Sequence, residues 1–151
     1  MTDIGLFLED NMIKPRLEDG DLAGDDTLET SVFISLFTDR RASLEELPPG
    51  HTRRRGWWGD IYSEVPGDQI GSKIWTLDRS KVTSETLALF ETRAYDGLRW
   101  MEEDGVASSV TVECGIDDEK RILLTIRIQR PDRTEPEKYG LIWDAQEIKR
   151  A

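Results

Sequence analysis

The feature that most constrains the fold is a change in the spacing of apolar residues at residue 105. Before it, over 83–103, apolar side chains recur every three or four residues, which places them on one face of an α-helix. They are Leu87, Phe90, Ala94, Leu98 and Met101. Thr83 or Ser84 can cap the start of this helix, and Asp104-Gly105 is a typical stop. The spacing therefore predicts a long amphipathic helix over 83–103.

After residue 105 the apolar residues alternate with polar ones, as they do in β-strands that bury one face. Two such stretches cover 106–114 and 122–128. In the second stretch, one face carries four apolar side chains: Ile122, Leu124, Ile126 and Ile128. Residues 139–143 can add a third strand after the loop 131–138. We expect an antiparallel meander with one buried face.

The first part of the chain is less regular. Residues 4–8 predict a strand or an extended arm, and the acidic stretch 18–29, interrupted by two glycines, predicts a loop. That loop ends in Asp26-Thr27-Leu28-Glu29, which is close to a capping box. Apolar residues spaced by four then predict a helix over 27–37. A strand over 32–36 is the alternative, and the cap favours the helix.

The predicted order is a helix, an irregular middle, a long helix and an antiparallel meander. We expect an α+β fold in which two main helices pack on a small antiparallel sheet, with a long irregular central segment. The length of 151 residues suits a single domain over 1–151. Apolar residues make up 37% of the chain and charged residues 34%. We therefore expect a thin core, or surface that is buried only in an assembly.

The charge of the chain limits the class of partner. Its formal net charge is −11, which disfavours nucleic acid and anionic membranes, because both attract cationic surfaces. The N-terminal residues lack the basic start and apolar stretch of a signal peptide, and no window is long and apolar enough to cross a bilayer. We expect folding in the cytoplasm where the chain is made, and a preference for basic partners.

The usual catalytic and metal-binding patterns find little support. Cys114 and His51 are the only residues of their types, and Cys114 alternates with apolar residues on a predicted strand, where a free cysteine behaves as a small hydrophobe. The acidic stretch fails the EF-hand spacing, and one histidine with one cysteine is too few for a usual zinc site. No phosphate-binding glycine motif occurs. The sequence predicts no cofactor, no metal and no enzymatic activity.

The central stretch 40–71 lacks helical or strand periodicity and concentrates arginine and tryptophan. Its most distinctive run is Arg53-Arg54-Arg55-Gly56-Trp57-Trp58-Gly59-Asp60. A long irregular segment inside a compact fold is usually functional, and Trp and Arg dominate interface hot spots. Neighbouring residues of an extended chain point opposite ways, so both tryptophans are hard to bury in one core. We predict a partner interface at Arg53, Arg54, Arg55, Trp57, Trp58, Asp60 and Trp75.

Two other interpretations of this run stay open. The tryptophans can be core anchors beside solvated arginines. Alternatively, the arginines can bind phosphates while bases stack on the rings, as in proteins that bind single-stranded nucleic acid. The acidity of the chain favours a protein partner over both.

Three blocks of sequence together resemble a known family. The first runs over 28–42 and continues in Arg55-Gly56-Trp57-Trp58-Gly59-Asp60. The second is Gly71-Ser72-Lys73-Ile74-Trp75-Thr76-Leu77, and the third is Leu98-Arg99-Trp100-Met101-Glu102-Glu103-Asp104-Gly105-Val106-Ala107. They resemble the Mu-like phage tail family of baseplate wedge proteins, and the resemblance extends over residues 4–130.

That family is similar in turn to the wedge subunit of T-even phages that helps nucleate the sheath. Leu36-Phe37-Thr38 and Arg55-Gly56-Trp57 take the places of its apolar helix end and its glycine-aromatic segment. The patterns differ after the second helix, where this chain has Glu103-Asp104-Gly105 and the T-even-like proteins have Glu-Pro-Arg. Contacts of that motif therefore do not transfer.

The resemblance implies a structural, non-enzymatic subunit of a contractile tail baseplate, located in the mature virion tail. It implies the larger baseplate wedge proteins and the tail sheath as partners, with the tail tube as a further candidate and no small-molecule substrate. Peptidoglycan cleavage is the alternative, because some T-even-type relatives carry a lysozyme-like label. Acids that could serve it are abundant, for example Glu64, Glu91 and Glu102, although nothing singles one out.

Overall fold

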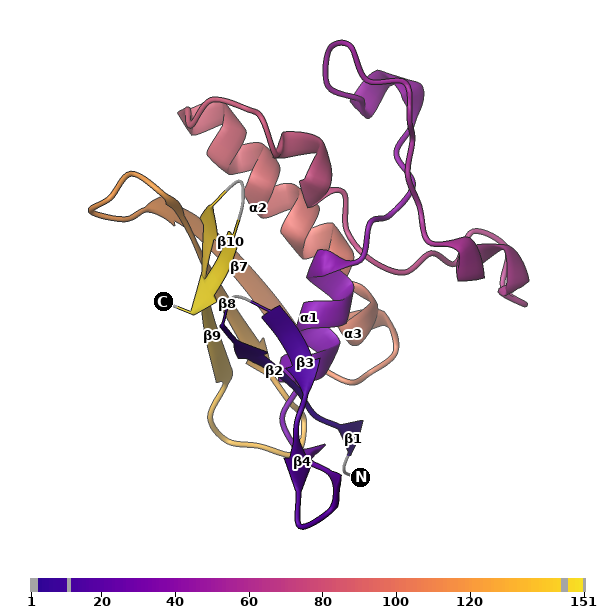
Figure 1. Ribbon diagram of the computed structural model, residues 1–151, viewed down its shortest axis with the longest axis vertical. Coiled ribbons are helices and arrows are strands. Elements are labelled where there is room, and N and C mark those ends of the chain that lie inside the picture. Colours follow the sequence, from indigo (N-terminus) through magenta and orange to yellow (C-terminus); the bar gives the residue numbers. More distant parts are fainter. Residues whose placement is uncertain (1–2, 11, 145–146, 151) are drawn as a thin grey trace.

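A four-stranded antiparallel sheet forms one layer of the computed structural model, which describes residues 3–10, 12–144 and 147–150 (Figure 1). The strands follow the order β10-β9-β8-β7 across the sheet. Their bounds are β7 Ser109–Ile116, β8 Ile122–Gln129, β9 Glu137–Asp144 and β10 Glu147–Arg150. The first three confirm the predicted meander. The fourth, β10, is a strand that the sequence pattern did not predict.

Helices form the second layer and confirm the α+β class (Figure 1). They are α1 Glu29–Phe37, α2 Ser84–Leu98 and α3 Trp100–Glu103. The predicted apolar stripe of α2 and α3 is fully buried at Phe90, Ala94, Leu98 and Met101. It shares a core with the predicted inner face of β8, where Ile126 and Ile128 are fully buried. Burial of this matched stripe and strand face is the main source of stability.

The limits of the long helix also follow the prediction. Thr83 caps α2, because its Oγ1 accepts a hydrogen bond from the N–H of Thr86 at 3.2 Å. Gly105 takes a φ of +72° just after α3, a conformation that ends helices and that glycine adopts without strain. Within these limits the helix is divided at Arg99, where α2 gives way to the short α3.

The start of α1 corrects the predicted capping box. The helix begins at Glu29, and no side chain of its N-cap residue, Leu28, forms a capping hydrogen bond. Instead, the N–H of Leu28 donates to Glu137 Oε2 at 3.0 Å and to Tyr139 Oη at 3.1 Å. Both acceptors lie on β9, 109 and 111 residues further along the chain. The sheet therefore satisfies the N–H of Leu28, while local side chains satisfy the next two: Glu29 N–H donates to Thr27 Oγ1 at 3.2 Å and Thr30 N–H donates to Asp25 Oδ2 at 3.4 Å.

Three aromatic rings join the two layers. Trp143 of β9 stacks on Phe37 of α1 with ring centroids 5.9 Å apart and an interplanar angle of 11°. The same indole meets Phe90 of α2 edge to face at 5.4 Å. Such pairs add stability beyond the area that they bury. Trp143 therefore links both main helices to the sheet.

The N-terminal region forms three short pairs of strands. These are β1 Asp3–Ile4 with β6 Gly24–Asp25, β2 Leu6–Glu9 with β3 Met12–Pro15, and β4 Leu17–Glu18 with β5 Asp21–Leu22. The strand or extended arm expected over 4–8 is present as two strands, β1 and β2, divided at Gly5. The loop expected over 18–29 contains most of the β4–β5 hairpin. Its turn is Asp19-Gly20, with φ of +53° and +84°. An Asp-Gly pair is typical of two-residue hairpins, so this signal was present in the sequence.

The central part of the chain is irregular, as predicted for 40–71. Over 39–82 the described elements are three short 3-10 helices: η1 Leu44–Glu46, η2 Trp58–Tyr62 and η3 Ile74–Leu77. In Figure 1 this segment projects from the side of the helices that faces away from the sheet, and it makes separate excursions around η1 and η2. The body formed by helices and sheet thus carries a projecting region with little regular structure.

Candidate partner interface

Backbone hydrogen bonds fix the base of the projecting segment against the end of α1. The N–H of Ala42 donates to the carbonyl of Arg54 at 3.0 Å, and Arg54 Nε donates to the carbonyl of Ala42 at 2.6 Å. The N–H of Ser72 donates to the carbonyl of Thr38 at 2.9 Å, and that of Arg40 donates to Ser72 at 3.0 Å. These hydrogen bonds therefore fix the base of both excursions, the first around η1 and the second around η2.

Two glycines allow this close approach. A Cβ atom on Gly71 would lie 2.1 Å from the Thr38 carbonyl oxygen, and Gly71 has a φ of +93°. A Cβ atom on Gly97, in α2, would lie 2.8 Å from Ser72 Cβ and 3.1 Å from the Ser35 carbonyl oxygen. Any side chain at either position would push the returning chain away from the helices.

Exposed Arg55 and buried Trp75 together support the base of the segment. The Arg55 guanidinium lies 4.5 Å from the centre of the Trp75 ring and pairs with Asp39 Oδ2 at 3.0 Å. Trp75 is 6% exposed, and its Nε1 donates to the Arg40 carbonyl at 2.9 Å. The sequence prediction placed Trp75 in the partner interface. In the structure, its ring lies in the core and holds the segment from beneath.

Asp60 has an internal role as well. Its Oδ1 accepts a hydrogen bond from the N–H of Ile70 at 3.1 Å, which closes the second excursion ten residues further along the chain. We call residues 57–70 the aromatic lobe. Asp60 holds the two ends of this lobe together, so its predicted place in the interface is accompanied by a structural task.

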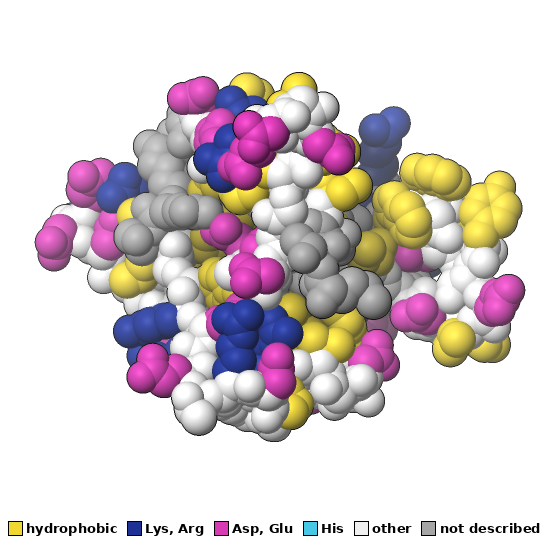
Figure 2. All heavy atoms as spheres, turned by 90° about the horizontal axis from the view of Figure 1, so that it is seen from below, with side chains coloured by type: hydrophobic (Ala, Val, Ile, Leu, Met, Phe, Trp, Pro, Cys, Tyr) yellow, Lys and Arg dark blue, Asp and Glu magenta, His cyan; other side chains and the backbone are white. Residues whose placement is uncertain are grey.

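The aromatic lobe exposes a cluster of large apolar side chains. Trp58 is 73% exposed and Trp57 is 43% exposed. Trp58 packs against Trp57 with ring centroids 5.5 Å apart, and against Tyr62 edge to face at 6.1 Å. Ile61 and Val65 are also exposed. Figure 2 shows hydrophobic side chains gathered on the lobe at the right, which stands off from the body.

Reasoning from an extended chain suggested that the two tryptophan rings would point in opposite directions. In the structure they do not. Trp57 has extended backbone angles, but Trp58 begins η2, so the direction of the chain changes between them. The Trp57 ring also crosses Gly59, where a Cβ atom would lie 2.1 Å from the ring. The result is one continuous aromatic surface that the body leaves uncovered.

The remaining predicted interface residues differ from one another. Arg53 is exposed, and no ion pair to it is found in the part of the chain that the structure describes. Arg54 is half-buried, and its Nε donates to the Ala42 carbonyl. The exposed residues among the seven are therefore Arg53, Arg55, Trp57 and Trp58. Arg55 also helps to organise the segment, as do Arg54, Asp60 and Trp75.

The two candidates for nucleophilic catalysis, Cys114 and His51, lie in different surroundings. Burial and the nearby Glu91 carboxylate raise the pKa of the Cys114 thiol to about 12, which opposes formation of a nucleophilic thiolate. His51 lies exposed on the projecting segment, far along the chain from β7.

Among the described residues, no group of His, Cys, Asp and Glu could hold a metal ion. Within the same residues, no helix is long and apolar enough to cross a membrane.

The acids considered for glycoside hydrolysis have structural partners or lie apart. Glu91 Oε2 accepts from the N–H of Cys114 at 3.2 Å, and Glu102 Oε1 accepts from that of Val110 at 2.7 Å. These two carboxylates therefore satisfy outward N–H groups on strand β7. Glu64 is exposed on the aromatic lobe. None of these contacts gives support to peptidoglycan cleavage.

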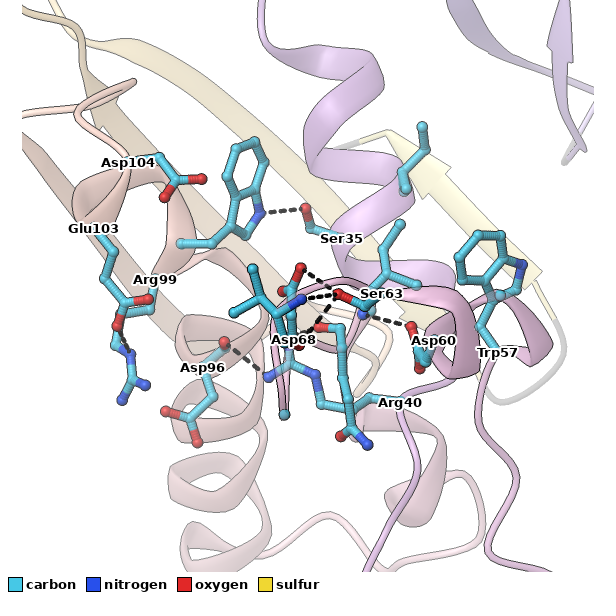
Figure 3. Close-up of a pocket in the computed structure, with 18 of the residues that line it drawn as sticks. Ser35, Arg40, Trp57, Asp60, Ser63, Asp68, Asp96, Arg99, Glu103 and Asp104 are labelled. Atoms are coloured by element: carbon cyan, nitrogen blue, oxygen red, sulfur yellow. Dashed lines mark hydrogen bonds and ion pairs between the residues drawn. The ribbon is translucent and has the colours of Figure 1, made fainter.

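A cleft of about 1020 Å³ separates the aromatic lobe from α2 and α3 (Figure 3). Trp57, Asp60 and Ser63 lie on the wall that the lobe provides, whereas Asp96, Arg99, Glu103 and Asp104 lie on the helical wall. Ser35 of α1 lies at one end and accepts a hydrogen bond from Trp100 Nε1 at 2.9 Å. The cleft combines apolar surface with several carboxylates.

Comparison with protein families places both the body and this projecting region in one family. The family model described as Phage protein GP46 matches residues 28–135. This match extends from just before α1 through the aromatic lobe, both later helices, β7 and β8. The chain belongs to the phage protein GP46 family.

Two relatives of the GP46 family show how the chain compares over most of its length. It is 38% identical to the baseplate protein gp46 of Escherichia phage Mu over 133 residues, which cover 87% of this chain and 90% of the relative. It is 40% identical to the Mu-like prophage FluMu protein gp46 of Haemophilus influenzae over 120 residues, which cover 79% and 81%. The resemblance to a Mu-like baseplate family is thereby confirmed. The region matched to the GP46 family contains every residue predicted for the interface.

Proposed function

We propose that this chain is a structural subunit of a phage tail baseplate that acts by assembling with other tail proteins. Membership of the GP46 family supports this role, as does the name of the phage Mu relative, a baseplate protein. The contacts of Cys114, Glu91 and Glu102 support a role without catalysis. In this proposal the mature location is the virion tail, after assembly in the host cytoplasm.

The finer proposal is that the chain belongs to the wedge of a contractile baseplate. Its partners are then the larger wedge proteins and the tail sheath, with the tail tube as a further candidate. We also infer that body and lobe form one domain over 1–151, because η2 has no buried residue and the lobe has no core of its own. A lobe without its own core is fixed by the body at one end and by a partner at the other.

The observation that carries the proposal is the exposed aromatic surface of the lobe. Large aromatic side chains dominate the binding energy of protein interfaces when a partner covers them. Exposing Trp57, Trp58 and Tyr62 together to water is unfavourable, since burial of each ring would lower the free energy. A monomer that keeps such a patch on a projecting lobe is expected to bury it in an assembly.

Co-expression with the other baseplate proteins of the same phage, followed by size-exclusion chromatography, tests this role. We expect the wild-type chain to co-elute with at least one of them and Trp58→Ala to weaken that complex. The matched control is Leu44→Ala, because Leu44 is 71% exposed on the other excursion. It should leave the complex intact.

Two outcomes contradict different parts of the proposal. If the wild-type chain elutes alone in every combination, the structural role in assembly is wrong. If Trp58→Ala and Leu44→Ala both co-elute like the wild type, the role can stand but the aromatic lobe is not the interface. Circular dichroism of each isolated variant establishes that the fold is retained.

A further inference from the structure

The cleft between the aromatic lobe and the helices has a strongly unbalanced charge. Five carboxylates line it, against two guanidinium groups: Asp60, Asp68, Asp96, Glu103 and Asp104 against Arg40 and Arg99. Both arginines are already engaged. Arg99 Nε pairs with Glu103 Oε1 at 2.8 Å, and Arg40 donates to the backbone carbonyls of Gln69 and Asp96. The cleft therefore attracts a positive group.

The acids of the helical wall occupy positions that disfavour them in the isolated chain. Asp96 lies in the last turn of α2, and Glu103 and Asp104 lie at the end of α3, with no basic residue in either last turn. A helix C-terminus carries partial negative charge, so carboxylates there are destabilising. The same carbonyl ends add to the negative potential of the cleft. Glu103 is compensated by its ion pair with Arg99, whereas Asp96 and Asp104 form no ion pair among the described residues. Residues that cost stability without a structural benefit are typical of binding sites.

The shape of the cleft is held by direct contacts. Arg40 NH2 donates to the Gln69 carbonyl at 2.7 Å, and Arg40 NH1 donates to the Asp96 carbonyl at 3.4 Å. Arg40 therefore connects the end of the lobe to α2 at the floor of the cleft, as Figure 3 shows. With Asp60 closing the lobe itself, both walls have fixed positions before any partner arrives, which lowers the entropy cost of binding.

Apolar side chains accompany the carboxylates in the lining. Trp57, Tyr62 and Val65 come from the lobe, and Ile34 and Trp100 come from the helices. Ile34 is exposed although it lies on α1. At about 1020 Å³ the cleft is at the upper end of the range for small-molecule sites. Its size and mixed lining suit a segment of polypeptide.

We propose that this cleft binds an extended, basic segment of another tail protein, in which Arg or Lys side chains flank an aromatic or aliphatic residue. The cationic groups meet Asp96 and Asp104, and the apolar residue lies against Trp57 and Trp100. This inference deepens the proposed function and rests on it, because the segment belongs to a partner in the same assembly. The outer aromatic surface around Trp58 and the inner cleft are then two sides of one docking region.

An array of short overlapping peptides, covering the other tail proteins of the same phage, tests the inference with the full chain as the probe. We expect the bound peptides to be net positive and to contain an aromatic or aliphatic residue. Binding should weaken with rising salt, because the charges are solvent-accessible. The double variant Asp96→Asn/Asp104→Asn should weaken binding about tenfold, as expected for loss of two exposed ion pairs.

The matched control is Asp118→Asn/Glu135→Gln, which changes the net charge equally at exposed positions in the loops between the sheet strands. It should bind like the wild type. Thermal unfolding adds a second readout, because Asp96→Asn/Asp104→Asn should keep or slightly raise the Tm while losing binding. A variant that lost binding because it misfolded would have a lower Tm than the wild type.

Three results would overturn the inference. They are an array on which no peptide binds, bound peptides that are neutral or acidic, and equal binding by the cleft variant and its control. None of these touches the proposed function, because co-elution with whole baseplate proteins is measured separately. If the chain co-elutes with a baseplate protein but any of these three results is obtained, binding of a basic segment in the cleft is rejected. The structural role then still stands.

Discussion

The body and the aromatic lobe use the same kinds of side chain in opposite ways. In the body, large apolar residues such as Phe90, Leu98 and Ile126 are fully buried between helices and sheet. In the lobe, Trp58, Ile61 and Tyr62 are each more than 70% exposed. The apolar side chains of the body stabilise the isolated fold. Those of the lobe can contribute only after a partner covers them.

The difference teaches which residues a stability measurement can detect. Free energy of unfolding depends on contacts that exist in the monomer, whereas free energy of assembly depends on surface that the monomer leaves open. Substitutions in the body should therefore change stability, and those in the lobe should change assembly. The predictions below test this separation, from the largest expected effect on stability to the smallest.

Phe90→Ala should be the most destabilising. Phe90 is fully buried and its ring meets Trp143 at 5.4 Å, so truncation leaves a cavity between α2 and the sheet. The expected loss is about 3–5 kcal/mol of unfolding free energy, measured by urea denaturation. Trp58→Ala removes a larger side chain, yet it should change stability by no more than about 0.5 kcal/mol. Comparable losses in the two variants would show that the lobe is part of the folded core.

Gly97→Ala tests the crossing that connects body and lobe. Alanine normally favours a helix over glycine, but here its Cβ would lie 2.8 Å from Ser72 Cβ. The clash should outweigh the propensity and lower the unfolding free energy by about 1–3 kcal/mol. Gly115→Ala is the matched control, because a Cβ atom there meets nothing within 4 Å. If Gly97→Ala has the higher Tm of the two, the returning chain does not pack on α2 as described.

The sequence was sufficient for the body where apolar spacing matched the structure. The stripe from Leu87 to Met101 identified α2 and α3, and the alternation from Ile122 to Ile128 identified β8, because in both the buried face repeats with the period of the element. The part of the α1 cap that β9 supplies was out of reach of such reasoning. Glu137 and Tyr139, which accept from Leu28, are distant in the chain, and local patterns carry no information about them.

The candidate site was predictable in composition but not in arrangement. The run from Arg53 to Asp60 stood out because Trp and Arg are concentrated there. Nothing in that run showed that Trp75 would be buried beneath Arg55, or that the lobe would face Asp96 and Asp104 across a cleft. One signal for the helical wall was present: acids without a basic residue at the end of the predicted helix, where negative charge is unfavourable.

Among the substitutions expected to destabilise the fold, Glu46→Gln should have the smallest effect, because it acts on the first excursion and not on the body. Glu46 pairs with Lys73 at 2.9 Å and accepts from the N–H of Ser43 at 2.8 Å. Partial burial opposes ionisation, but these hydrogen bonds and the Lys73 charge outweigh it and lower the pKa of Glu46 to about 2. At neutral pH we expect a loss of about 0.5–1 kcal/mol, as for a partly exposed ion pair.

The pH dependence distinguishes this ion pair from a general effect of the substitution. A carboxyl whose pKa is lower in the folded state stabilises the fold fully above its unfolded value of 4.5. That contribution decreases as the pH falls below 4.5, and it is gone below the folded pKa of about 2. Wild type and Glu46→Gln should therefore differ most in urea denaturation at neutral pH and converge near pH 2. A difference that is constant across this range would mean that Glu46 acts through packing and that its charge does not hold the first excursion to Lys73.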